Sequence, residues 1–284
     1  MTVLWINNSY AYHLEIIESI IQKHNEIIKK KANIIYLTLM ERRGNDDKEY
    51  DKLLPPFIKY ITEKYVDIKI EKPNNFDYYI DVTLKLQNKN KIKNNDPNKY
   101  FYIAHNPGNS LSEMKNVYWL TSFFERYINA DILPFADKMN MNRQIPIYII
   151  QGNKRHNRRD YTLLDAILSK TYNYKFIIRW NGFNKLPEKY KNKVEDLSGS
   201  FIEYHKHFLD CYCLIPLISK NKNPDYYSKK LTSSINYTRG YKLKCLIDKD
   251  LQMIYNLEDV EIYNNKNDIS LAFEKTLIDF YTNK

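Results

Sequence analysis

The chain has 284 residues, enough for one large domain or two ordinary ones, and 43% of them are hydrophobic, so it can bury a substantial core. Its net charge of +10 favours anionic partners: phosphorylated small molecules, nucleic acid or an anionic membrane face. No long apolar run predicts a membrane span, no basic leader marks a signal peptide, and three cysteines are too few for a disulfide framework. We therefore expect a cytoplasmic protein.

Asn, Lys, Ile and Tyr are used heavily, and Ala and Gly sparingly, in all parts of the chain. This bias is typical of an AT-rich coding sequence, such as that of a large DNA virus, in which case the compartment would be the host cytoplasm. The tyrosine content and part of the positive charge therefore say little about function.

The first half alternates short apolar runs with helical periodicity, which predicts βα units and a mainly parallel sheet. We expect strands at 2–6, 33–39, 76–84 and 100–105, and helices at 12–31 and 53–65, the second entered through Pro55 and Pro56. Residues 87–99 predict a polar loop, and the polar stretch 136–144 predicts a linker.

From residue 145 the pattern restarts. We expect strands at 145–152, 174–180 and 211–218, helices at 161–170 and 201–210 with Asp160 as the N-cap of the first, then a helix that ends at Gly240 and a strand after it. An amphipathic helix closes the chain. The sequence thus predicts an α/β protein with domains at 1–140 and 141–284.

Gly152 closes a strand, and a basic loop with Lys154, Arg155, Arg158 and Arg159 leads from it into the next helix. A glycine turn, a helix N-terminus and guanidinium groups together suit a phosphate. The alternative is a solvated basic loop in a lysine-rich chain, and the loop by itself favours neither interpretation.

A second such entrance lies at 226–248. If the helix begins near Lys229 or Lys230, then Thr232, Ser233 and Ser234 lie in its first turn and could hold a diphosphate. Ordinary capping by Ser and Thr is the alternative. Because both entrances follow strands of one parallel sheet, we expect them to face the same crevice, which favours a phosphate-bearing ligand.

Two histidines stand at predicted strand ends of the first half: His13 follows the first strand and His105 closes the strand at 100–105. Such positions often carry chemistry in α/β proteins, and histidine titrates near neutral pH. A lone histidine more often has a structural role. No motif with metal-ligand spacing is present, so we expect no metal.

These patterns resemble the GT-B-fold glycosyltransferases. Their nucleotide-sugar domain typically has a strand ending in Gly-Arg and a Lys about six residues beyond the Gly; here Gly152 is kept, Asn153 replaces the Arg, and Arg158 stands at the Lys. The "SSINYTRGYKLKCLID" segment is similar to the helix and Gly-led strand near the end of the family. The resemblance implies two Rossmann-like domains facing across a cleft, with the last helix crossing back onto the first domain.

The resemblance also implies an activity: metal-independent transfer of a sugar from a nucleotide-diphospho-sugar to a hydroxyl of a glycan or protein acceptor, with no cofactor beyond the donor. His13 would act as the base if transfer inverts the sugar, and His105 would contact the sugar if transfer retains it. Tyr227 and Ile235 stand where retaining members carry two glutamates, which leaves open a glycosyltransferase-like protein that binds without catalysis. A nucleic-acid-binding protein ranks third, because the basic residues recur at strand ends rather than along one stripe.

Overall fold

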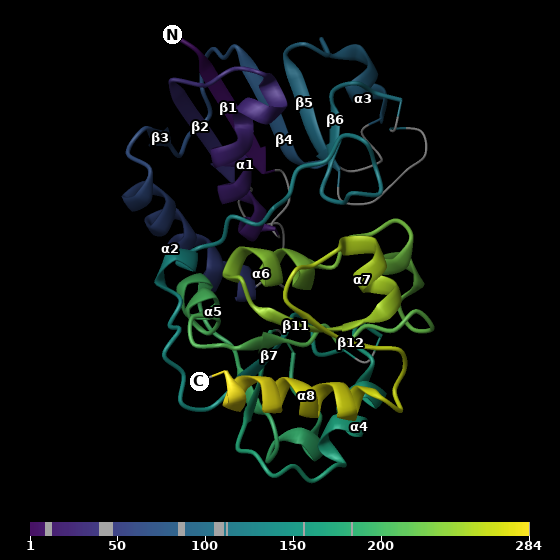
Figure 1. Ribbon diagram of the computed structural model, residues 1–284. Helices are drawn as coiled ribbons and strands as arrows, with labels where there is room; N and C mark the ends of the chain where they lie inside the picture. Colours follow the sequence, from purple (N-terminus) through teal and green to yellow (C-terminus); the bar gives the residue numbers. More distant parts are fainter. Residues whose placement is uncertain are drawn as a thin grey trace. The chain divides into compact units, whose positions relative to one another are not determined.

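The computed structural model describes residues 1–8, 13–39, 48–84, 89–104, 111, 113–155, 157–182 and 184–283. Its contacts divide the chain into two compact units (Figure 1). Unit 1 consists of Met1–Pro134 with the short segments Ser200–Ile202 and Lys229–Leu231, and unit 2 holds the rest from Phe135 onward. Among the described helices, none is long and apolar enough to cross a membrane.

Unit 1 is built on a six-stranded sheet of order β3-β2-β1-β4-β5-β6, and every neighbouring pair is parallel. Its elements are β1 (Val3–Asn8), α1 (Leu14–Ile28), β2 (Ile34–Leu39), α2 (Lys48–Lys64), β3 (Ile68–Lys69), β4 (Tyr78–Leu84), α3 (Lys89–Asn94), β5 (Tyr100–Ala104) and β6 (Val117–Trp119). Leu4 and Ile6 of β1 are fully buried, as are Ile17 and Ile20 of the amphipathic α1. This alternation in β1 leaves Trp5 and Asn7 half-buried on the second face.

Two predictions for unit 1 need correction. Helix α2 begins at Lys48, so Pro55 and Pro56 lie inside it rather than at its start; they remove two N–H donors without ending the helix. The predicted polar loop 87–99 contains α3, because the buried Ile92 packs with Tyr102 and Ala104 and gives this short helix an apolar anchor.

Unit 2 repeats the architecture, with the sheet order β12-β11-β10-β7-β8-β9 and all pairs parallel. Its strands are β7 (Ile147–Gln151), β8 (Ile177–Asn181), β9 (Glu195–Leu197), β10 (Cys213–Leu214), β11 (Lys244–Asp248) and β12 (Val260–Tyr263). Its α-helices are α4 (Tyr161–Leu168), α5 (Phe201–Lys206), α6 (Ser233–Tyr241), α7 (Lys249–Tyr255) and α8 (Ile269–Thr282), with short 3-10 turns η3 (Ala136–Lys138), η4 (Glu188–Tyr190) and η5 (Pro224–Tyr227).

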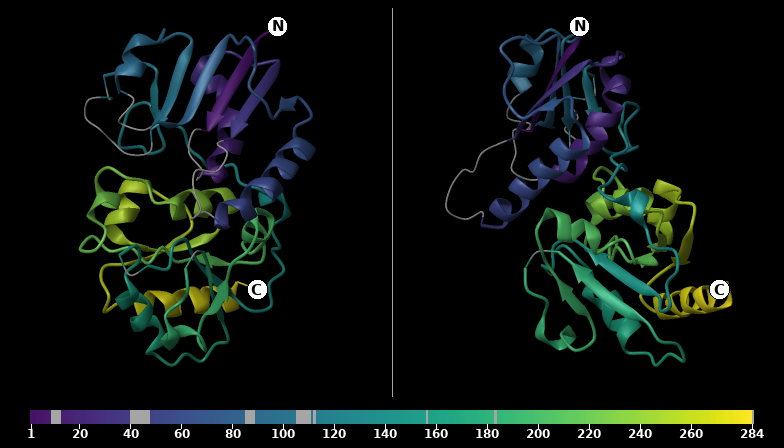
Figure 2. Two further views of the ribbon diagram at one scale, coloured as in Figure 1. Left: turned by 180° about the vertical axis from the view of Figure 1, so that it is seen from behind. Right: turned by 90° about the vertical axis from the view of Figure 1, so that its left-hand side faces the viewer.

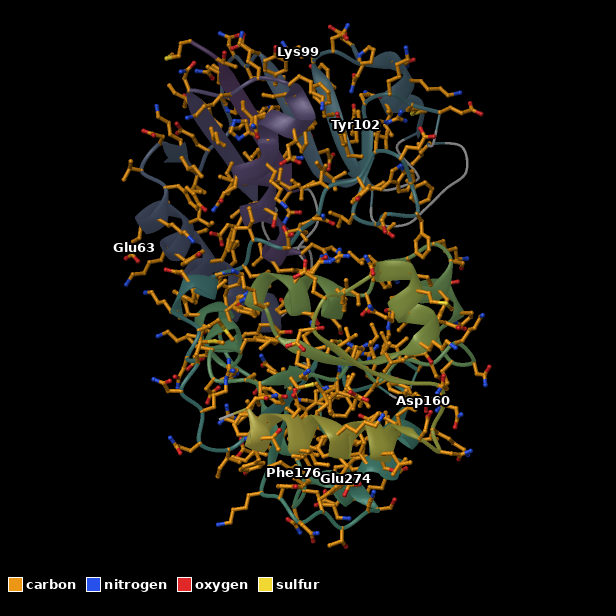
Figure 3. All side chains as sticks on the ribbon, viewed as in Figure 1. Glu63, Lys99, Tyr102, Asp160, Phe176 and Glu274 are labelled. Atoms are coloured by element: carbon orange, nitrogen blue, oxygen red, sulfur yellow. The ribbon has the colours of Figure 1, made fainter. Side chains whose placement is uncertain are left out.

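Aromatic side chains fill much of the core of unit 2. Tyr148 of β7 packs on Phe273 of α8 with ring centroids 4.4 Å apart, and its hydroxyl group lies 2.7 Å from Thr276 Oγ1. Phe176 packs on the same Phe273, and Lys170 pairs with Glu274 on the outer side of α8 at 2.5 Å (Figure 3). These contacts place α8 on the sheet of unit 2, and the whole helix belongs to that unit.

Counted in chain order, both sheets have the order 3-2-1-4-5-6, which is that of the Rossmann fold. The predicted α/β class with two Rossmann-like, mainly parallel domains is thereby confirmed. In such sheets, ligands bind at the carboxyl ends of the strands where the strand order reverses. That point lies between β1 and β4 in unit 1, and between β7 and β10 in unit 2.

Candidate anion-binding site

The backbone conformation of the turn after β7 favours a glycine. Gly152 has a φ of 100°, a left-handed conformation that L-residues rarely adopt. A Cβ at this position would also come within 2.5 Å of Arg159 Nη2. The Gly152 N–H donates to Asn181 O at 2.9 Å, and Trp180 Nε1 donates to Gly152 O at 3.1 Å, so the turn is fixed to the end of β8.

Arg159 lies against this turn and is only 4% exposed. Its Nη1 donates to the Arg158 carbonyl at 2.8 Å and its Nη2 to the Gln151 carbonyl, while its Nε is buried and has no hydrogen-bond partner among the described residues. Burial lowers the pKa of Arg159, and no carboxylate in the described part of the chain pairs with it. A buried positive charge with an unused donor is costly. An anion bound at this point would remove that cost.

The helix α6 meets the same strand end. Thr232 is its N-cap, with Oγ1 accepting from the Ser234 N–H at 3.4 Å, so the helix begins at Ser233 rather than near Lys229. The hydroxyls of Ser233 and Ser234 each donate to Gln151 Oε1 at 3.2 Å. The two helix entrances singled out in the sequence are therefore joined through Gln151, the residue before Gly152.

The far end of α6 also differs from expectation. Gly240 lies inside the last turn, and the helix ends at Tyr241, because Lys242 takes the left-handed conformation with a φ of 50°. Its N–H closes the helix on the Arg239 and Thr238 carbonyls.

The cations of the basic loop separate into two kinds. Lys154 is 3% exposed, and its ammonium group pairs with Asp196 and donates to Gly182 O at 2.8 Å and Leu197 O at 3.2 Å. It therefore attaches the loop to β8 and β9. Arg155 and Arg158 are exposed to solvent.

The N-terminus of α4 is already occupied by its own cap. As predicted, Asp160 is the N-cap: Oδ1 accepts from the Thr162 N–H at 3.1 Å, and Oδ2 accepts from Ser219 Oγ at 2.6 Å (Figure 3). Burial would raise the pKa of Asp160, but these hydrogen bonds outweigh it and leave the pKa below its ordinary value. A carboxylate here disfavours a phosphate on the α4 amides, so Arg159, the Gly152 turn and the start of α6 together are the better candidate for an anion site.

In unit 1, His13 immediately precedes α1 in a left-handed conformation with a φ of 76°. Its Nδ1 lies 3.3 Å from Glu15 Oε1, and the two side chains are 37% and 24% exposed. A carboxylate beside one ring nitrogen favours the tautomer in which the other nitrogen accepts a proton. His105 lies outside the described residues. Lys229 and Lys230 belong to unit 1 by their contacts, and their role remains a prediction.

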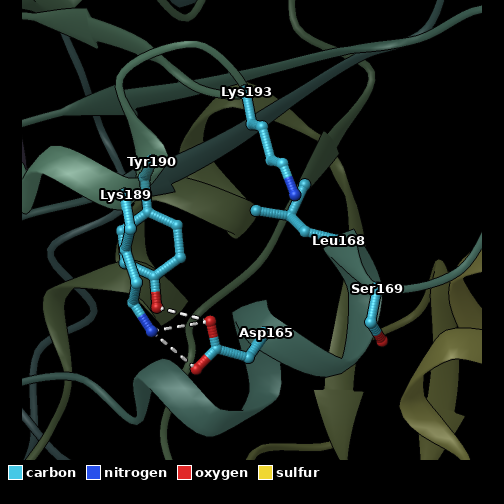
Figure 4. A pocket seen from close by; sticks show the side chains of 6 residues that line it. All are labelled: Asp165, Leu168, Ser169, Lys189, Tyr190 and Lys193. Atoms are coloured by element: carbon cyan, nitrogen blue, oxygen red, sulfur yellow. Dashed lines mark hydrogen bonds and ion pairs between the residues drawn. The ribbon is translucent and has the colours of Figure 1, made fainter.

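A hollow of about 270 Å³ lies elsewhere on unit 2, toward the last turn of α4 (Figure 4). Asp165 and Tyr190 line it, and the Asp165 carboxylate accepts from Lys189 Nζ at 2.9 Å and from the Tyr190 hydroxyl at 2.8 Å. The lining includes Leu168 and Ser169 at the end of α4 opposite the Asp160 cap and none of the residues of the candidate site, so the hollow is not part of that site.

No protein-family model matches the chain, and a search of curated proteins finds no relative. Among solved structures, the chain is similar to a glycosyltransferase from Rickettsia africae ESF-5, at 13% identity and a TM-score of 0.49 over 99% of this chain and 88% of that one. It is also similar to the E. coli heptosyltransferase WaaC with ADP, at 9% identity and a TM-score of 0.46 over 100% and 98%. MurG from Acinetobacter baumannii follows, at 8% identity and a TM-score of 0.43 over 98% and 91%.

Proposed function

We propose that the chain is a glycosyltransferase that binds a nucleotide-diphospho-sugar on unit 2 and transfers its sugar to a hydroxyl of a glycan or protein acceptor without a metal. The observation that carries this proposal is Arg159, a buried guanidinium at the switch point of a Rossmann-like sheet that pairs with no carboxylate in the described part of the chain. A diphosphate there would meet Arg159 and the N-terminus of α6.

In this mechanism the positive groups stabilise the charge that develops on the leaving diphosphate. Arg159 supplies a fixed donor, and the exposed Arg155 and Arg158 close on the phosphates from solvent. Lys154 positions the loop through Asp196 instead of contacting the donor. On unit 1, His13 would take the proton of the acceptor hydroxyl, with Glu15 holding its ring. If transfer retains the sugar configuration, His105 would contact the sugar.

A second candidate is a protein that binds the donor without turning it over. Ile235 is fully buried in α6, and the Tyr227 hydroxyl donates to Ile218 O at 3.3 Å, so neither position offers the carboxylate found in retaining glycosyltransferases. Binding and turnover must therefore be measured separately.

Thermal unfolding with a panel of nucleotides and nucleotide-sugars, with EDTA or Mg²⁺, tests the donor site. A ligand at about 100 times its dissociation constant stabilises a fold by roughly 2.7 kcal/mol, a readily measured shift in Tm. We expect a shift with one diphosphonucleotide in EDTA that Arg158→Ala reduces. Lys175→Ala, an exposed cation before β8 at the opposite edge of the sheet, should leave it unchanged.

Each result decides between the candidates. No shift with any nucleotide contradicts the donor site, and an equal loss in the Arg158 and Lys175 variants shows nonspecific attraction only. A shift without consumption of any nucleotide-sugar during long incubation favours the binding protein. Turnover that His13→Gln abolishes while the Tm shift persists supports the enzyme.

A further inference from the structure

An aromatic row crosses the sheet of unit 1 on the face opposite α1. Trp5 of β1 is in register with Tyr36 of β2 and with Tyr79 of β4, and Tyr79 is in register with Tyr100 of β5. All four side chains are half-buried. Neighbouring rings are close, with centroids 4.8 Å apart for Trp5 and Tyr79 and 5.5 Å apart for Tyr79 and Tyr100.

In the part of unit 1 that the structure describes, no helix covers this face over β1 and β2 (Figure 2, left). The connection from β3 to β4, residues 70–77, contributes Phe76 instead, whose ring lies 5.2 Å from Trp5 and 5.9 Å from Tyr100. Parallel sheets usually bury both faces under helices. Over β4 and β5, Tyr79 and Tyr100 also pack against the cluster that contains Ile92 of α3. Over β1 and β2 only the loop lies on the aromatic face, so this part of the face is available to a ligand.

Lysine ammonium groups gather at these rings. Lys69 continues the register beside Tyr36 and lies 5.4 Å from the centre of its ring. Lys72 Nζ lies 5.6 Å from the centre of the Trp5 ring, and Nζ of Lys99, which is labelled in Figure 3, lies 4.5 Å from the centre of the Phe76 ring. Most of the net positive charge of the chain lies after residue 134, and residues 1–134 are nearly neutral overall. The lysines at these rings are therefore a local concentration of positive charge. The lysines attract an anionic ligand by their charge, whereas a neutral glycan would gain only hydrogen bonds from them.

A polar row lies next to the aromatic one and holds it in place. Trp5 Nε1 donates to Thr38 Oγ1 at 2.8 Å, and Thr38 Oγ1 donates to Asn7 Oδ1 at 2.7 Å. Asn7 Nδ2 donates to the Tyr79 hydroxyl at 2.9 Å. This network fixes the two central rings before any ligand arrives, which reduces the entropy lost on binding.

We propose that this face of unit 1 binds single-stranded nucleic acid, with bases stacking on the aromatic row and phosphates paired with Lys69, Lys72 and Lys99. Aromatic side chains on a sheet surface with cations beside them are the combination that holds unpaired bases and their backbone. A duplex hides the faces of its bases and would bind more weakly. The proposal does not depend on glycosyl transfer or on the donor site.

The fluorescence of Trp5 provides a direct test. The chain has three tryptophans, and Trp119 and Trp180 are 1% and 0% exposed, so only Trp5 can be quenched by a stacking base. We expect dT20 and rU20 to quench the emission of the full chain at low salt, and a duplex of equal length to do so less. Three lysine–phosphate pairs predict that log K falls with log[salt] with a slope of about −2.

Matched variants separate this site from general polycation binding. Lys72→Gln should weaken dT20 binding and reduce the salt slope by about 0.7, while Lys59→Gln, an exposed lysine on α2, should change neither. Trp5→Ala should weaken binding about tenfold or more. Because Lys72 is exposed, Lys72→Gln is the variant that disturbs the fold least. No quenching by either oligonucleotide, equal losses in the two lysine variants, or quenching by neutral cellohexaose alone would each overturn the proposal.

Discussion

We expect Arg159 to lower the stability of the ligand-free protein and to strengthen the binding of an anion. Its guanidinium is buried and pairs with no carboxylate among the residues that the structure describes. Arg159→Met, which keeps most of the volume and removes the charge, should therefore leave the ligand-free protein as stable or more stable. The same change should abolish the Tm shift produced by a diphosphonucleotide. Urea unfolding with and without nucleotide measures both effects. A variant that unfolds much more easily yet still responds to nucleotide would show that Arg159 is structural.

Gly152 allows a second test at the residue scale. Gly152→Ala places a Cβ against Arg159 in a backbone conformation with a φ of 100°, which should cost roughly 1–3 kcal/mol and displace the arginine. Gly240→Ala is the control, because that residue lies in the last turn of α6, where alanine is favoured over glycine by up to about 1 kcal/mol. Equal Tm values for the two variants would contradict the strained turn.

At the scale of elements, α8 is attached to the sheet by a titratable cluster. Lys244 at the start of β11 pairs with Asp259 at 2.6 Å and with Asp279 of α8 at 3.1 Å, and Tyr212 donates to Asp279 at 3.0 Å. Burial would raise the pKa of Asp279, but the bonds from Lys244 and Tyr212 outweigh it and leave the pKa below its ordinary value.

A lowered pKa in the folded state means that the unfolded chain binds the proton more tightly. The contribution of Asp279 is therefore complete above about pH 4, the ordinary carboxyl pKa, and is lost as the pH falls through the folded value. We expect Asp279→Asn to flatten the dependence of the urea midpoint on pH below about pH 4, where the unmodified chain loses this contribution. Asp67→Asn, an exposed carboxylate in no described ion pair, should keep the slope of the unmodified chain.

Elements with strong local signals could be predicted from the sequence, and those decided by their neighbours could not. The apolar run of β7 and the Asp160 cap of α4 are confirmed. The strands β9 and β12 were missed because they are short, charged edge strands, whose pairing depends on the sheet beside them. The sequence of α3 is mostly polar, with Lys89 and Lys91 among its residues, so it shows no helical pattern of apolar residues. The position of α3 depends on one buried residue, Ile92.

The candidate site shows the same division. Gly152 and the hydroxyls of Ser233 and Ser234 could be singled out, because a strand-end glycine and a helix N-terminus have local patterns. Nothing local distinguishes the buried Arg159 from the exposed Arg158, since burial is decided by what packs around the loop after folding. Gln151 was missed for a similar reason: its role is to join two segments that are far apart in the sequence.

At the scale of the whole molecule, the two proposals assign different ligands to different units, and hydrogen exchange can separate them. A diphosphonucleotide should slow exchange of the amides at 152–155, 157–159 and 232–236, where Gly152, Arg159 and the start of α6 meet. The oligonucleotide dT20 should instead protect the connection 70–77 and β1, β2 and β4, around the aromatic row. Each ligand leaves the other set unchanged if the sites are distinct. Protection of one common set by both ligands would mean that the chain has a single anion site, and protection of unit 2 alone by dT20 would remove the case for the aromatic row.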